Sequence, residues 1–183
     1  MINCKKDLKE YLHADLIALH RKKFCGIIGK YLYYLRKTEY HNNTHHKIRG
    51  RIFSSLLKVC SVISGISIPP NTFGKGLALY HYGTIIVNPS ARFGDFCCIQ
   101  AGVNVSENVS GGNYVYLAPG AKVNAHLKIA DYVIIASNAV LTKNVEESNV
   151  TWAGVPAKKI SNKGWHPSHE IIAEVNDSPY MEK

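Results

Sequence analysis

The sequence predicts a mainly β fold, a parallel β-helix that follows an α-helical segment. Between Leu117 and Glu146, aliphatic or small apolar residues recur at the first and fifth positions of five successive hexads. Before Gly65 the apolar residues recur instead every three or four positions, which predicts amphipathic helices. A strict period of six fits neither a helix nor a half-buried strand. It is typical of a chain that turns a corner every six residues and stacks coil on coil.

Three helices are expected in residues 1–65, because apolar residues have helical spacing within 8–24, 27–40 and 47–64. Gly26 separates the first two helices, and the polar stretch 40–46, YHNNTHH, is expected to be a loop. Gly65 follows the last periodic residue and is expected to end the third helix. The helices could cap one end of the β-helix, since a solenoid needs its open ends covered.

The whole net charge of +9 belongs to this segment, because residues 1–60 carry 13 Lys and Arg against four Asp and Glu. A basic surface attracts nucleic acid, anionic lipid headgroups or acidic glycans. No nucleic-acid-binding motif accompanies the charge, so nucleic acid is not an expected partner. We expect at most a peripheral membrane contact, or an approach to an acidic glycan, through this basic segment.

A less regular six-residue period of apolar residues precedes the hexad run. It begins at Phe73, slips by two residues after Ile85, and resumes at Phe93. Residues 106–113, SENVSGGN, interrupt this six-residue period and are expected to form a loop that leaves the coil. The end of the chain is polar and is expected to be loosely held. The predicted organisation is a helical segment 1–65, a β-helix 66–160 and a C-terminal tail 161–183.

The sequence also indicates the cellular compartment and the oxidation state of the cysteines. The five cysteines are scattered without CxxC spacing, so neither a disulfide framework nor a zinc knuckle is expected. No apolar stretch approaches the roughly 20 residues of a membrane span. The N-terminal sequence lacks the apolar region of a signal peptide, and we expect a cytoplasmic protein with reduced thiols.

Three features together resemble the hexapeptide-repeat acyltransferases: the hexads, the segment GKGLALYHYG at 74–83, and AGVPAKKI at 153–160. The resemblance is to the serine acetyltransferase-like branch, which includes the O-acetyltransferases of capsule and exopolysaccharide synthesis. It implies a left-handed coil, acetyl-CoA as the acyl donor, and a homotrimer with active sites in the clefts between subunits. It implies no metal.

The resemblance also implies roles for individual residues. His81 matches the catalytic histidine, and an imidazole with a pKa near neutrality suits a general base that deprotonates an attacking hydroxyl. The resemblance places the donor groove at Pro119, Gly120, Ala136 and Ser137. It places the basic positions near the 3′-phosphate of the donor at Lys158 and Lys159.

Two departures bear on the acceptor. The family's aspartates before and upstream of the histidine are replaced by Tyr80 and Ile66. The family's Arg-His pair for the amino-acid carboxylate is missing, because no arginine or histidine lies between Arg92 and His126. Aromatic and neutral hydrogen-bonding side chains suit a sugar, and the expected substrate-binding residues are Tyr80, Tyr82, Asn104, Tyr114 and His126.

The leading prediction is an acetyl-CoA-dependent O-acetyltransferase that acts on a carbohydrate hydroxyl, in a surface polysaccharide or its lipid-linked precursor. Serine O-acetyltransferase is the alternative. A zinc hydratase of the γ-carbonic anhydrase type is a further alternative, in which His81 and His126 would be ligands, but the coils hold no third histidine. A non-catalytic assembly role for the helices also stays open. The HNNTHH histidines lack cysteine or carboxylate partners, and no metal site is expected there.

Overall fold

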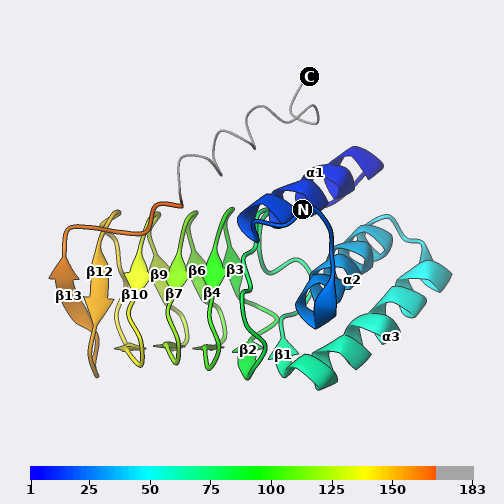
Figure 1. Ribbon diagram of the computed structural model, residues 1–183. Helices are drawn as coiled ribbons and strands as arrows, with labels where there is room; N and C mark the ends of the chain where they lie inside the picture. Colours follow the sequence, from blue (N-terminus) through cyan, green and yellow to red (C-terminus); the bar gives the residue numbers. More distant parts are fainter. Residues whose placement is uncertain (168–183) are drawn as a thin grey trace.

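The computed structural model describes residues 1–167 and consists of three helices followed by a β-solenoid (Figure 1). The helices are α1 (Lys5–Ala18), α2 (Gly26–Asn43) and α3 (Lys47–Ser64). The strands are short because the chain turns a corner after each one. They are β1 (Ile66–Ser67), β2 (Ile85–Val87), β3 (Arg92–Phe93), β4 (Cys98–Ile99), β5 (Asn104–Val105), β6 (Ser110–Gly111), β7 (Tyr116–Leu117), β8 (Lys122–Val123), β9 (Lys128–Ile129), β10 (Ile134–Ile135), β11 (Val140–Leu141), β12 (Thr151–Ala153) and β13 (Lys158–Ser161).

The strands form three sheets, which are the three faces of the solenoid. Sheet I has the order β1-β2-β5-β8-β11, sheet II has the order β13-β12-β10-β7-β4, and sheet III has the order β3-β6-β9. Strands pair in parallel, except that β13 runs antiparallel to β12 at one end of sheet II. The prediction of a parallel β-helix preceded by helices is therefore confirmed.

The core of the solenoid is a stack of inward-facing side chains on each face. In sheet II, Ile99, Leu117 and Ile135 occupy successive register positions and are fully buried. Sheet I has the corresponding stack Val87, Val105, Val123 and Leu141. Burying each such side chain contributes roughly 1.5–3 kcal/mol, which offsets the entropy lost when the chain is ordered.

The predicted loop at 106–113 is wrong. Residues Ser110–Gly111 form β6 inside the coil, paired with β3 and β9. Gly111 therefore stands at an inward position, between Phe93 and Ile129. A Cβ added to Gly111 would lie 2.1 Å from Cδ1 of Phe93, because the Phe93 ring already fills that space. The period of six continues through the segment, but its apolar side chain comes from the neighbouring coil.

The two-residue slip also lies elsewhere than predicted. Val87, and not Ile85, is the register partner of Val105, so the extra residues lie between Leu79 and Val87. Ile85 pairs instead with Ile66 of β1. The chain needs the extra length there because it receives the end of α3: Gly83 N donates to the carbonyl of Ser64 at 2.8 Å. The first coil is consequently longer at the corner that carries the sequence YHYG.

The helix boundaries differ from the predictions at α1 and α2. Helix α1 begins after Cys4, whose side chain forms a capping box with Asp7, and it ends at Ala18 instead of residue 24. Helix α2 runs to Asn43 and takes up part of the predicted loop, since Asn43 is held there by hydrogen bonds to Ile2 and Asn71. Helix α3 has the predicted bounds, and Gly65 ends it with a φ of 73°.

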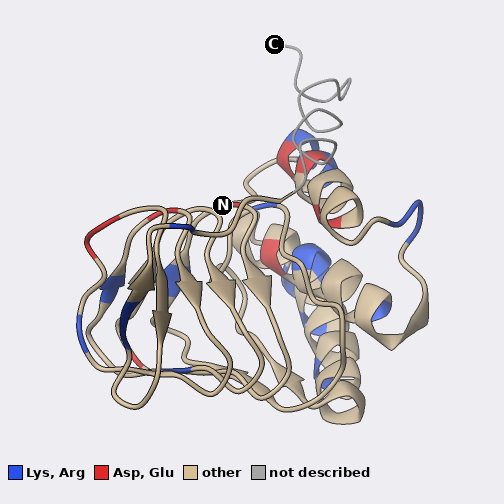
Figure 2. Ribbon diagram, turned by 60° about the vertical axis from the view of Figure 1, so that its left-hand side comes forward, with Lys and Arg blue, Asp and Glu red and all other residues tan. Residues whose placement is uncertain are grey.

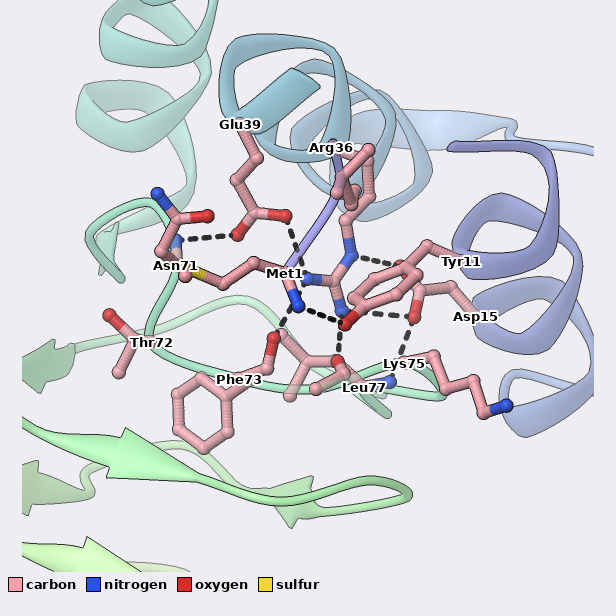
Figure 3. A network of polar contacts seen from close by, with 12 residues as sticks. Met1, Tyr11, Asp15, Arg36, Glu39, Asn71, Thr72, Phe73, Lys75 and Leu77 are labelled. Carbon is pink, nitrogen blue, oxygen red and sulfur yellow. Dashed lines mark hydrogen bonds and ion pairs between the residues drawn. The ribbon is translucent and has the colours of Figure 1, made fainter. Parts of the chain in front are cut away.

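A buried ion network joins α1 and α2 to the first coil (Figure 3). Arg36 of α2 lies 2.8 Å from Asp15 of α1 and 3.0 Å from Glu39, and all three side chains are almost completely buried. Arg36 also donates to the carbonyl of Gly74, and Asp15 accepts from the backbone N–H of Leu77. Burial disfavours the charged guanidinium, but Asp15 and Glu39 outweigh it and raise the pKa of Arg36. The helices are thus fixed to one end of the solenoid, in agreement with the predicted capping role.

The first residues of the predicted tail 161–183 pack back on the solenoid. The Trp165 ring lies 5.7 Å from that of Tyr116, and His166 stacks on Tyr132 at 4.7 Å. The rest of the predicted tail, residues 168–183, lies outside the described residues. Within residues 1–167, no helix combines the length and apolar character that crossing a bilayer requires.

Candidate functional site

One edge of the solenoid gathers most of the residues that the sequence singled out. This edge, where the chain turns from sheet II to sheet I, is called the II/I edge. Successive corners are joined by backbone hydrogen bonds between 2.7 and 3.0 Å long. In each bond an N–H donates to a carbonyl of a neighbouring coil: Gly102 to Thr84, Gly120 to Ala101, Asn138 to Pro119 and Val140 to Gly154. His81 lies at the first corner of this edge. Pro119–Gly120 and Ala136–Ser137 lie at two later corners, so the structure brings the predicted donor positions into line with His81.

The corner at His81 is the one lengthened by two residues. His81 and Tyr82 are both exposed there, with Tyr82 70% exposed. Tyr80 points the other way: its hydroxyl donates to the carbonyl of Ala18 at 3.0 Å, and burial raises its pKa to about 12. Tyr80 therefore anchors the corner to α1 and does not offer its hydroxyl to a substrate.

Neither of the two positions where the family has an aspartate supplies one to His81, since Tyr80 and Ile66 occupy them. The upstream position, Ile66, is buried in β1, and among the described residues no carboxylate forms an ion pair with His81. Within residues 1–167 no side-chain hydrogen bond or ion pair fixes the orientation of the exposed imidazole as a carboxylate would.

Small residues occupy the remaining corners of the II/I edge. Gly102 and Gly120 have φ values of 80° and 74°, where glycine is favoured. A Cβ on Gly120 would lie 2.1 Å from Oδ1 of Asn138, so these corners approach too closely for larger residues. Pro119 and Ser137 are exposed. A linear ligand could lie along these corners, bonded to backbone groups.

Two lysines follow the far end of this edge. Lys158 and Lys159 open β13, just after the turn that contains Gly154, and both are exposed. Lys159 forms an ion pair with Glu147 at 2.6 Å, so part of its charge is already compensated.

A cation that the sequence analysis missed lies beside the edge. Lys122 is the register neighbour of Asn104 on the outer face of sheet I, and its Nζ donates to the carbonyl of Gly102 at 2.6 Å. Gly102 is one coil away from the corner of His81. Lys122 lies between Arg92 and His126, where the sequence has no arginine or histidine. The signal that could have found Lys122 is its outward hexad position, directly before the inward Val123.

Asn104 also lines a groove on the outer face of sheet I. This open groove has a volume of about 610 Å³. Its polar groups come from Ser67, Asn88, Asn104, Ser106 and Glu107. His81 is not part of its lining, which comes from β1, β2 and β5 and from the corner where sheet I turns into sheet III.

Two predicted substrate residues lie on other edges. Tyr114 is stacked between Phe96 at 5.5 Å and Tyr132 at 4.6 Å, where sheet III turns into sheet II, and burial raises its pKa. His126 lies where sheet I turns into sheet III, 3.5 Å from Glu107. Within one chain the structure does not bring either residue to His81.

The histidines of residues 1–167 do not converge on a common centre. His81 and His126 occupy different edges, so they cannot share a metal within one chain. His41 and His46 have their Nδ1 atoms 3.4 Å apart, and burial lowers the pKa of His41. Residues 1–167 contain no group of three side chains placed to hold a metal ion.

Sequence comparison links the chain to serine acetyltransferases. No family model matches it. It is 28% identical over 123 residues to a serine acetyltransferase of Synechococcus elongatus, and this match covers 62% of the chain and 49% of that protein. It is 29% identical over 119 residues to the Helicobacter pylori serine acetyltransferase, with 60% and 69% covered. The chain thus spans about half the length of the first relative and about two thirds of the second.

Solved structures agree with the sequence relatives. The Neisseria gonorrhoeae serine acetyltransferase superposes with a TM-score of 0.67 at 20% identity, over 94% of this chain and 70% of that one. A serine acetyltransferase solved in complex with CoA gives a TM-score of 0.72 at 20% identity, over 85% and 71%. The chain is therefore similar in sequence to serine acetyltransferases and shares their fold, a left-handed parallel β-helix with N-terminal helices.

Proposed function

We propose that the protein is an acetyl-CoA-dependent O-acetyltransferase of the serine acetyltransferase kind, with His81 as general base. The observation that carries this proposal is the position of His81 on the II/I edge. It is exposed at a lengthened corner, in line with the small corners at Pro119–Gly120 and Ala136–Ser137. The similarity to serine acetyltransferases, one of them solved with CoA, supports the same chemistry.

The donor would lie along the small corners of the II/I edge. Backbone N–H and C=O groups would hold its extended arm, and Lys158 would attract its phosphates at the far end. His81 then takes the proton of the attacking hydroxyl as that oxygen bonds to the thioester carbonyl carbon. The C–S bond breaks, and the proton passes from His81 to the leaving thiolate, so that the imidazole is neutral for the next cycle.

L-Serine is the acceptor that we propose first. The sequence predicted a carbohydrate acceptor because no arginine or histidine between Arg92 and His126 could bind a carboxylate. Lys122 supplies that cation, one coil from the corner of His81. A charge-assisted hydrogen bond from Lys122 to the serine carboxylate would orient the hydroxyl towards the edge.

A carbohydrate acceptor is the second candidate. The groove on sheet I, with Asn88, Asn104 and Ser106, offers neutral hydrogen-bonding groups of the kind that bind sugar hydroxyls. In either case we propose a homotrimer, since a neighbouring subunit would turn the II/I edge into a cleft and could bring residues of a second edge, such as His126, to His81.

The test is the release of CoA from acetyl-CoA with L-serine, L-serinamide and a panel of sugars as acceptors. We expect turnover with L-serine, and a fall of roughly 10²- to 10⁴-fold in kcat for His81→Ala, because general-base catalysis contributes about that much. Undiminished turnover in His81→Ala, or no turnover with any acceptor, would contradict the proposal.

Lys122→Met separates the two acceptors. It should lower kcat/KM for L-serine by roughly 10- to 100-fold, the value of a charge-assisted hydrogen bond. The same variant should leave kcat/KM for L-serinamide nearly unchanged, because L-serinamide lacks the carboxylate. Lys143→Met, at an exposed lysine on another edge, is the matched control. Preference for a sugar, together with an inert Lys122→Met, would replace serine with a carbohydrate.

A further inference from the structure

Helix α3 exposes an apolar stripe along its outer side. Six large apolar side chains of this helix are exposed: Ile48 (78%), Ile52 (53%), Leu56 (38%), Val59 (57%), Val62 (78%) and Ile63 (67%). At about 100° per residue these positions fall within an arc of about 120°. The opposite side of α3, with buried Leu57 and Cys60, packs against α2. Figure 1 shows α3 on the outer side of the helical segment, with its C-terminal end at β1 and the rest of the helix directed away from the solenoid.

Basic residues flank this stripe on both sides. Helix α3 has no Asp or Glu, and all four of its Lys and Arg residues are exposed. By the same helical geometry Lys47, Arg51 and Lys58 border one side of the arc, and Arg49 borders the other. Long basic side chains in these positions can cover apolar surface with their stems and extend their charges outward.

The rest of the helical segment does not neutralise this charge. Of its four acidic residues, Asp15 and Glu39 are buried against Arg36, Glu10 pairs with Lys75 of the solenoid, and Asp7 caps α1. Figure 2 shows Lys and Arg distributed over the helices, with Asp and Glu mainly on α1 and at the junction with the solenoid. The outer surface around α3 therefore presents cations beside exposed apolar side chains.

We infer that α3 lies on the surface of an anionic lipid bilayer. Its apolar stripe would enter the boundary between headgroups and acyl chains, and its Lys and Arg side chains would reach the lipid phosphates. The helix is about 27 Å long and would lie parallel to the membrane plane. A second copy of the chain fits less well, because pairing two α3 faces would bring like charges together without any acidic partner on the helix. The inference does not depend on the proposed activity.

Flotation of the full-length protein with lipid vesicles tests this inference. Wild-type protein should float with vesicles of phosphatidylglycerol and phosphatidylcholine, but not with phosphatidylcholine alone. Binding should weaken in 0.5 M NaCl, where charges are screened over a few ångströms. Arg51→Gln/Lys58→Gln should weaken binding roughly tenfold or more, since each cation near an anionic surface contributes about 1 kcal/mol.

The apolar stripe has its own variants and controls. Ile52→Ser/Val59→Ser/Ile63→Ser should abolish flotation, whereas Ile160→Ser, a similarly exposed change on β13, should not. Lys128→Gln/Lys143→Gln is the matched charge control. All variants change exposed side chains, and circular dichroism confirms their folding. No flotation of the wild type, or full binding by the stripe variant, would overturn the inference. A stripe variant that changes the oligomer mass of a protein that never floats would assign the face to a second copy instead.

Discussion

At the residue scale, Gly111 occupies an inward position of the six-residue repeat although it has no apolar side chain. Sheet III has Phe93, Gly111 and Ile129 at successive inward positions, and the Phe93 ring lies over the glycine. The pair shares the volume that two medium-sized residues fill elsewhere. A pattern that requires an apolar side chain at each hexad position misses such a pair, because the ring that fills the space at Gly111 belongs to Phe93 of the preceding coil.

This pairing predicts coupling between the two positions. Gly111→Val should destabilise the protein by roughly 1–3 kcal/mol through overpacking, and Phe93→Ala by roughly 3–5 kcal/mol through a cavity. The double variant should be less destabilised than the sum of the two, by about 0.5–3 kcal/mol, because valine fills part of the cavity. Urea unfolding of the four proteins measures this coupling, and strictly additive changes would show that the two side chains do not share space.

At the element scale, the sequence predicted which elements exist better than how they are joined. The hexads defined the strands and α3 had the predicted bounds, because both depend on local periodicity. The positions of the two-residue slip and of the end of α1 depend on contacts between distant segments. The slip lies where Gly83 bonds to Ser64 at the end of α3. The end of α1 lies where Ala18 accepts a hydrogen bond from Tyr80 of the first coil. Periodicity contains no information about such contacts.

The ion network of Arg36 is the element-scale junction between helices and solenoid. Arg36→Met should destabilise the protein by roughly 3–5 kcal/mol, because it leaves Asp15 and Glu39 buried without their cation. Lys30→Met, on the exposed side of the same helix, should change stability by less than about 0.5 kcal/mol. Thermal and urea unfolding measure both. Equal stability of the two variants would show that the network does not hold the helices to the coil.

At the scale of the whole molecule, three edges of one solenoid have different characters. The II/I edge has His81, small corners and Lys122, a second edge has the aromatic stack of Tyr114, and the third has His126 with Glu107. The sequence supplied His81 and the donor positions through the family resemblance, and the structure shows that they occupy one edge, at corners of successive coils. The sequence could not assign Tyr114 to another edge, since the assumed loop at 106–113 interrupted the register just before it. His126 lies in the regular run, where the period itself puts it one corner after Pro119–Gly120.

The most direct measurement of the central claim combines CoA binding with turnover. His81→Gln should bind CoA within about twofold of the wild type but lose roughly 10²- to 10⁴-fold in kcat. Ser137→Trp should weaken CoA binding by blocking the II/I edge, and Lys128→Trp on sheet III should bind CoA normally. If His81→Gln keeps its turnover, or if Lys128→Trp and not Ser137→Trp loses CoA binding, the reaction does not take place on the II/I edge.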